Sequence, residues 1–171
     1  MRFARFVLVA AGVCLSAAAA GGSPIAVGAG GNHATLVINF GDGAGYVFDV
    51  AFDGAPTGLG LFDIVEASTT LTTVRNEFEW GVYLDGIAYE GHSNAGYGGG
   101  EDWWHYWIKD AETDAWESPW DFGASGRPVS DGSFDGWVFG SADVPVVAPD
   151  PATLGLLALA AAGALLRRRR A

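Results

Sequence analysis

Aromatic side chains are crowded into one short stretch, DWWHYWIKDAETDAWESPW, at residues 102–120. Five of the seven tryptophans lie there, between Trp103 and Trp120. Alternate side chains of an extended strand point to opposite faces, so this stretch predicts a strand with two aromatic faces. One face carries Trp104, Tyr106 and Ile108, and the other carries Trp103, His105 and Trp107.

Only one of these two faces can fill the core of a small domain. The other must be covered by another part of the chain, by a partner or by a flat ligand such as a sugar or a tetrapyrrole. Two interpretations stay open: Trp116 and Trp120 fold back over the second face, or that face is a binding platform. The candidate ligand-binding residues are Trp103, Trp104, Tyr106 and Trp107.

Catalytic chemistry is poorly supported by the residue patterns. GHSNAG resembles a nucleophile elbow around Ser93, but Ala95 replaces the required glycine and NAGYGGG cannot supply the following helix. Carboxylate pairs such as Glu101 and Asp102 could act in a glycosidase, although 20 acidic residues produce such pairs by chance. We expect no enzyme, with a carbohydrate-active enzyme as the third and weakest class.

Metal chemistry has little support either. The three histidines are widely spaced and lack HExxH or cysteine partners, which argues against zinc. Asp131 and Asp135 flank Gly132 and are interpreted as turn residues, with weak calcium binding left open and no EF-hand pattern. We therefore predict no metal site.

Alternating strands and one helix would position these residues. ATLVINFGDGAGYVFDVAF predicts a hairpin turning at residues 42–45, and GLGLFDIVEAS predicts a short amphipathic helix. Further strands are expected at residues 71–78, 81–84, 103–108 and 133–140, with an Asp85-Gly86 turn and a loop over 91–100. This order predicts an α+β fold in which a mixed sheet packs on one short helix.

Charge is distributed very unevenly along the chain. All 20 acidic residues lie between Asp42 and Asp150, where the only basic residues are Arg75, Lys109 and Arg127. Such an acidic body repels phosphate backbones, so no nucleic-acid partner is expected. The 22 Trp, Tyr and Phe residues supply apolar area that disordered acidic chains lack.

Both ends have the composition of targeting segments. Residues 1–20 combine Arg2 and Arg5 with an apolar core and a small-residue cleavage site near Ala20, which predicts a secretory signal peptide. Residues 21–33 are expected to be a flexible Gly-rich segment, and residues 141–151 a linker. Residues 152–171 are predicted to form a transmembrane helix followed by arginines that stay in the cytoplasm.

The C-terminal 23 residues resemble the PEP-CTERM sorting signal. A Pro-acid-Pro tripeptide, an apolar helix and a terminal basic cluster coincide, with aspartate in place of the usual glutamate. The matching residues are Pro149, Asp150, Pro151, Arg167, Arg168, Arg169 and Arg170. The resemblance implies an exosortase-type sorting enzyme, a transient stay in the inner membrane, and delivery to the cell surface or extracellular matrix of a Gram-negative bacterium.

The body, residues 34–140, resembles the transcobalamin C-terminal-like domain. DWWHYWIKDAETDAW, FGAS and VSDGSFDGWVF are similar to that family's aromatic and Asp-Gly signature, with Ser133 in place of its second aspartate. The resemblance implies a β-grasp-like fold and places Trp104, Tyr106 and Trp107 at the family's aromatic positions. It also implies cobalamin as a ligand to be tested, although this chain lacks the family's larger helical partner domain.

These patterns predict an exported, surface-sorted binding or structural module without catalysis. Its expected partners are signal peptidase, the sorting enzyme, the membrane before processing and an exopolysaccharide. The alternative is a carrier-like domain for a corrinoid or another flat cofactor.

Overall fold

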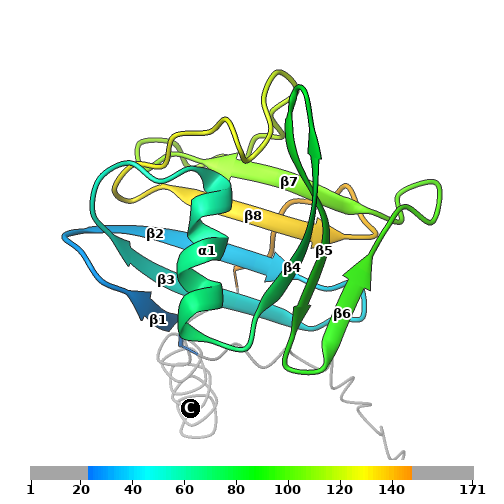
Figure 1. Cartoon of the computed structure of the whole chain (residues 1–171), viewed down its shortest axis with the longest axis horizontal. Coiled ribbons are helices and arrows are strands. Elements are labelled where there is room, and N and C mark those ends of the chain that lie inside the picture. Colours follow the sequence, from blue (N-terminus) through cyan, green and yellow to red (C-terminus); the bar gives the residue numbers. More distant parts are fainter. Residues whose placement is uncertain (1–22, 148–171) are drawn as a thin grey trace, which may run out of the picture.

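The computed structural model describes residues 23–147, which form a mixed α+β fold with two sheets and one short helix (Figure 1). The strands are β1 (Ile25–Gly28), β2 (Asn32–Asn39), β3 (Gly45–Phe52), β4 (Thr72–Phe78), β5 (Gly81–Tyr89), β6 (His92–Ala95), β7 (Trp104–Lys109) and β8 (Phe134–Phe139). The helix α1 spans Gly58–Ser68.

The larger sheet has the strand order β1-β3-β2-β8-β7. It is mixed, because β1 runs parallel to β3 and β2 runs parallel to β8, whereas the β2–β3 and β7–β8 pairs are antiparallel. The first hairpin is confirmed, with Asn39 opposite Gly45 at its turn. The predicted single sheet is corrected, since β4, β5 and β6 form a second, antiparallel sheet.

Helix α1 matches the predicted segment GLGLFDIVEAS, and its end, which the Thr-rich residues after it left open, lies at Ser68. Thr57 caps its N-terminus, with the hydroxyl accepting a hydrogen bond from the Gly60 N–H at 3.2 Å. Thr69, in extended conformation, ends it. The side chains of Leu61, Phe62 and Val65 are fully buried, and each contributes roughly 1.5–3 kcal/mol of apolar transfer free energy.

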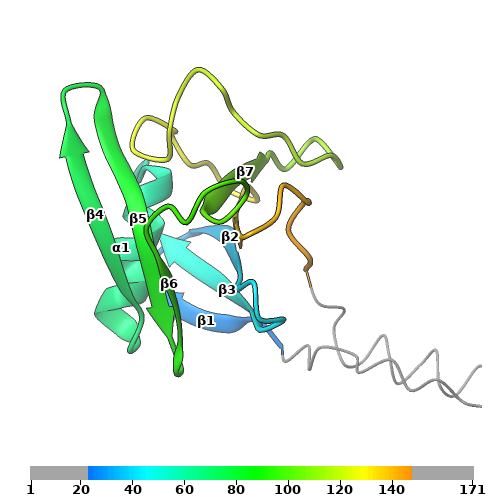
Figure 2. The ribbon, with the colours of Figure 1, turned by 90° about the vertical axis from the view of Figure 1, so that its right-hand side faces the viewer.

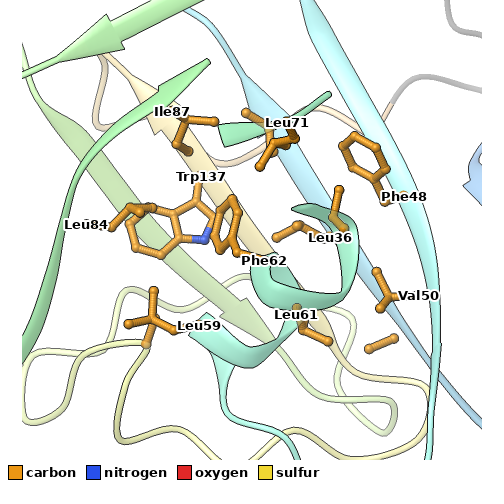
Figure 3. Close-up of a cluster of buried hydrophobic side chains, with 14 of the residues drawn as sticks. Leu36, Phe48, Val50, Leu59, Leu61, Phe62, Leu71, Leu84, Ile87 and Trp137 are labelled. Carbon is orange, nitrogen blue, oxygen red and sulfur yellow. The ribbon is translucent and has the colours of Figure 1, made fainter. Parts of the chain in front are cut away.

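Helix α1 and the three-stranded sheet cover the same face of the larger sheet (Figure 2). Their side chains meet in one core, where Phe62 packs edge to face against Trp137 at 5.7 Å. Leu84 and Ile87 of β5 complete the same cluster (Figure 3). The remaining labelled core residues are Leu36, Phe48, Val50, Leu59, Leu61 and Leu71.

The predicted Asp85-Gly86 turn is wrong, because both residues lie inside strand β5. The strand continues to Tyr89, and its pairing with β4 slips at this point, leaving Asp85 as the extra residue of a β-bulge. Gly86 is needed there because a Cβ atom would lie 2.8 Å from the Cβ of Ala95 on β6. The Asp-Gly pair therefore marks a close strand approach, and β6 occupies part of the predicted 91–100 loop.

The folded domain extends beyond the predicted limits of 34–140. Residues 21–33 were expected to be flexible, whereas β1 lies within them and pairs with β3. Residues 141–147 lie on the outer face of the larger sheet, where Asn39 exchanges two hydrogen bonds with the Val146 backbone at 2.8 and 3.3 Å. The first half of the predicted linker is thus part of the domain.

Candidate functional site

The fold decides which aromatic face of β7 fills the core, and it is the face that carries Trp104 and Tyr106. Trp104 is buried, its ring lies 5.4 Å from Phe40, and its indole N–H donates to the Asn94 carbonyl at 3.0 Å. Tyr106 stacks on Trp137 with ring centroids 4.6 Å apart. Two of the four candidate ligand-binding residues, Trp104 and Tyr106, therefore pack in the core.

The outer side of β7 is partly covered by other segments. Trp103 lies against the His105 ring at 3.7 Å, and Trp107 is half-buried next to Gly136 of β8. Trp116 folds back over Gly136. The approach is so close that a Cβ atom at Gly136 would lie 3.0 Å from the Trp116 ring and would clash with Pro145. Trp120 does not fold back, since 92% of its surface is exposed.

A buried ionic cluster lies beneath the first turn of α1. The Tyr106 hydroxyl donates to Asp135 Oδ2 at 2.5 Å, and Arg127 Nε lies 3.3 Å from Asp135 Oδ1. Arg127 Nη2 also donates to Asp110 Oδ1 at 2.9 Å. The prediction that Asp135 is a turn residue is wrong, because Asp135 lies in strand β8. The alternation along β8 could have revealed the cluster, since Asp135 shares its inward face with Trp137.

Burial dominates the electrostatics of this cluster. It raises the pKa of Asp135 to about 6, although Arg127 and the Tyr106 hydrogen bond favour the carboxylate. Burial and the Asp135 charge raise the pKa of Tyr106 far above its ordinary value. A Cβ at Gly58 would lie 2.5 Å from Asp135 Oδ2, so α1 closes directly over the carboxylate. The cluster therefore joins α1, β7 and β8.

The three histidines each pair with a different carboxylate. The Nδ1–Oδ distances are 2.9 Å for His33–Asp49 and 2.6 Å for His92–Asp42, and His105 Nε2 lies 3.1 Å from Glu101 Oε2. The Ala44 N–H, followed by His92, lowers the pKa of Asp42. Within residues 23–147 no three His, Cys, Asp or Glu side chains gather as metal ligands.

An apolar groove of about 590 Å³ opens on the outer face of the larger sheet. It lies between the β2–β3 turn and the segment 141–147, and its apolar wall includes Phe40, Val138 and Val144. The groove is separate from Trp103 and Trp107, which do not line it.

The largest exposed aromatic side chains lie elsewhere, around the turn between β4 and β5. Trp80 is 73% exposed and Phe78 50% exposed, and their rings stack at 4.9 Å with only 4° between their planes. Trp120 and Phe122 are exposed on the neighbouring loop. We call Phe78, Trp80, Trp120 and Phe122 the aromatic cap. Both views place the β4–β5 turn away from the two ends of the described chain (Figures 1 and 2).

One hydrogen bond joins the two segments that carry the cap residues. The Val82 N–H donates to Ser125 Oγ at 3.3 Å. The loop holding Ser125 is in turn fixed to α1, since Ala124 O accepts from the Leu59 N–H at 3.2 Å. Gly81, with φ of +139°, allows the close approach, because a Cβ there would lie 2.9 Å from Ser125 Oγ. The two segments are thus held by the Ser125 hydroxyl and by the backbone of Ala124.

The surroundings of the cap are acidic. Glu77, Glu79 and Asp121 are exposed beside its rings in the sequence. The basic residues of the described chain are engaged elsewhere: Arg75 pairs with Asp63 and Glu66, Arg127 is buried, and Lys109 lies over the Phe134 ring at 4.1 Å. Exposed carboxylates therefore flank the cap residues in the sequence.

The predicted signal peptide, the tripeptide Pro149, Asp150 and Pro151, the apolar segment and Arg167, Arg168, Arg169 and Arg170 lie outside the described residues. Among residues 23–147 no helix is long and apolar enough to cross a membrane. Comparisons with protein-family models, with curated proteins and with solved structures find no match.

Proposed function

We propose that this chain is an exported, surface-sorted and non-catalytic binding module whose binding surface is the aromatic cap. The observation that carries the proposal is the exposure of Trp80 and Trp120 on an otherwise acidic surface. Exposed apolar clusters of this kind mark interaction sites, because each Å² left in water costs about 25 cal/mol that burial against a partner recovers.

The position of the cap supports this function. The core already buries Trp104, Trp137 and the large aliphatic side chains, so the fold does not need Trp80 or Trp120 for its own packing. The cap also lies away from the two ends of the described chain (Figure 1). A surface so placed can meet an external partner while the chain's C-terminal segment engages a membrane.

Export and sorting form the second half of the proposal. Its support is the sequence: the signal-like residues 1–20, and the Pro-Asp-Pro tripeptide followed by an apolar run and four arginines. Mass spectrometry of the mature protein tests it, with cleavage expected near Ala20 and near Pro149–Pro151. Mature protein that still carries Arg167 to Arg170 would replace sorting by a permanent anchor.

We also assign the domain to a β-grasp-like arrangement similar to the transcobalamin C-terminal-like domain. The support is a mixed sheet crossed by one helix, in which α1 follows the first hairpin and packs on Trp137. Cobalamin binding remains the second candidate function, and the apolar groove of about 590 Å³ is the feature that favours it. Visible absorbance that fails to co-elute with the protein on gel filtration after incubation with cobalamin would remove this candidate.

The binding function is tested with envelope and matrix fractions of a Gram-negative bacterium. The wild-type chain should be retained on one of these fractions, and Trp80→Ala with Trp120→Ala should abolish the retention. The matched control is Tyr97→Ala, because Tyr97 is also an exposed aromatic residue, 71% exposed, but lies outside the cap. Equal retention of the wild type and the double variant would refute the assignment of the cap.

A further inference from the structure

We infer that two copies of this chain associate edge to edge through strand β4, so that their three-stranded sheets join into one continuous antiparallel sheet. The inference goes beyond the proposed binding function and does not depend on it. It is carried by the open edge of β4, by the exposure of its side chains and by the match between its sequence and a two-fold axis.

Strand β4 is the longest edge strand whose free side stays unpaired within residues 23–147. It has seven residues and pairs only with β5, since no backbone hydrogen bond joins it to another segment of the described chain (Figure 2). The edge strands β1 and β6 have four residues each. Strand β7 has six, and Glu117 already occupies its free side through two hydrogen bonds with Ile108, both of 2.8 Å. An open edge such as that of β4 is a template for pairing with another chain.

The side chains of β4 are exposed, although two of them are large and apolar. Five of its seven residues are exposed, whereas none of the nine residues of β5 is. Val74 is 52% exposed and Phe78 is 50% exposed. Arg75 donates to Asp63 of α1 at 2.6 Å, so its face of the strand looks toward the helix. Alternation then places Val74, Asn76 and Phe78 together on the opposite face, where a second strand would remove apolar surface from water.

A two-fold axis at Asn76 gives this edge a self-complementary register. Two identical edges related by such an axis pair antiparallel, and opposed residues lie on the same face of the joined sheet. With Asn76 on the axis, Val74 lies opposite Phe78 of the second copy. In the same register Arg75 lies opposite Glu77, and each of these pairs occurs twice. Apolar pairs and opposite-charge pairs directly across two strands both stabilise a sheet.

Charge disfavours the two neighbouring registers. The strands can shift only in steps that keep opposed residues on the same face. The next register in one direction places Arg75 opposite Arg75, and the next in the other direction places Glu77 opposite Glu77. Like charges directly opposite each other are destabilising, so the register centred on Asn76 is favoured over both.

Electrostatics allows this association despite the net charge of −11 on each chain. The Arg75 guanidinium has five N–H groups, of which three bond to Asp63, Glu66 and Thr73. Two N–H groups are therefore left for Glu77 of the second copy. The remaining carboxylates repel one another mostly over longer distances, and charges more than about 8 Å apart are largely screened at physiological ionic strength.

The test compares the oligomeric state of the purified full chain with that of variants on the two edges of the same sheet. Sedimentation in detergent at about 0.15 M salt should show a dimer. Asn76→Lys places two like charges on the axis and should weaken dimerisation about tenfold, which corresponds to about 1.4 kcal/mol. Ser93→Lys is the matched control, because Ser93 is exposed on β6, the opposite edge strand, and this variant should dimerise like the wild type.

A cysteine on the axis tests the register itself. In a chain whose one cysteine, Cys14, is replaced by serine, Asn76→Cys should form a disulfide-linked dimer under mild oxidation. The reason is that opposed residues of an antiparallel pair have Cα atoms about 4.5–5.5 Å apart, which lies within the span of a disulfide. Ser93→Cys on the other edge should stay monomeric on a non-reducing gel. Each variant must unfold at a temperature close to that of the wild type, and the cysteine variant carries the test if Asn76→Lys fails to fold.

Three outcomes would overturn the inference. A wild-type chain that stays monomeric would do so, and so would a dimer that Asn76→Lys leaves intact, because association would then use another surface. Cross-linking of Ser93→Cys as fast as that of Asn76→Cys would show that the disulfides arise from random collisions. None of these results touches the proposed binding function, which the Trp80→Ala and Trp120→Ala retention assay tests separately.

Discussion

Asp135 makes the stability of this fold depend on pH in an unusual direction. The carboxyl group is fully buried beneath α1, and burial raises its pKa from 3.8 to about 6. Since the folded state then holds the proton more tightly than the unfolded state, this stabilisation is fully present below pH 3.8 and is lost as the pH rises through about 6. Asp135→Asn removes the ionisation and with it this pH dependence.

The size of the effect follows from the two pKa values. A difference of one pKa unit is worth about 1.36 kcal/mol, so moving from 3.8 to about 6 corresponds to a loss of about 3 kcal/mol in the free energy of unfolding at neutral pH. Most of that loss is expected between pH 4 and pH 7. Ordinary globular domains have 5–15 kcal/mol of stability in total, so a change of this size is readily measured.

Urea unfolding followed by tryptophan fluorescence provides the assay. Wild type and Asp135→Asn are compared at several pH values from 4 to 7, so that the pH dependence of the other acidic residues cancels in the difference. The wild type should lose about 3 kcal/mol relative to the variant over this range. Tyr106→Phe is the companion variant, because loss of its hydroxyl donor removes an interaction that lowers the Asp135 pKa, and the loss should extend to higher pH.

A raised Asp135 pKa is refuted if the difference between the two profiles stays constant, or if the wild type gains stability relative to Asp135→Asn as the pH rises. Either result would mean that the Arg127 guanidinium, whose Nε lies 3.3 Å from Asp135 Oδ1, stabilises the carboxylate at least as much as burial penalises it.

Three further outcomes are expected from substitutions elsewhere. Thr57→Ala should lower the free energy of unfolding by about 1 kcal/mol, because the Gly60 N–H loses its hydrogen-bond acceptor at the N-terminus of α1. Thr57→Ser should restore the lost stability, and urea unfolding checks both variants. Phe62→Ala should cost about 3–5 kcal/mol by opening a cavity against the core, and calorimetry that finds under about 1 kcal/mol would contradict the packing. Asn39→Ala should abolish protection of the Val146 amide in hydrogen exchange while core amides stay protected; an unchanged Val146 rate would refute the docking of residues 141–147.

Local sequence patterns were sufficient to predict most of the helix and strand positions. The first hairpin, α1 and strand β8 follow from alternation and helical periodicity. The alternation along β7 correctly assigned Trp104 and Tyr106 to one face and Trp107 to the other. These features depend on residues close together in the sequence, and period-2 and period-3.6 patterns report them directly.

The candidate site was harder to predict than the helix and strands, because the exposure of a side chain depends on which distant segments meet. The sequence indicated that β7 had two aromatic faces, but only the fold shows that the core takes Trp104, that Trp116 and Pro145 partly cover the outer face, and that Trp120 stays exposed. Phe78 and Trp80 are alternate residues at a hairpin turn, yet their stacking becomes visible only once the turn is formed.

The sequence by itself determined the composition and the local order of this protein: an acidic aromatic domain, its hairpin, its helix, and two ends with the pattern of targeting segments. The tertiary structure decided the division into two sheets, the burial of Asp135 with Arg127, and the identity of the aromatic cap. The physical reason is that charge and periodicity are properties of single segments. Burial arises only between segments, and here Asp135 and Tyr106 are 29 positions apart in the chain.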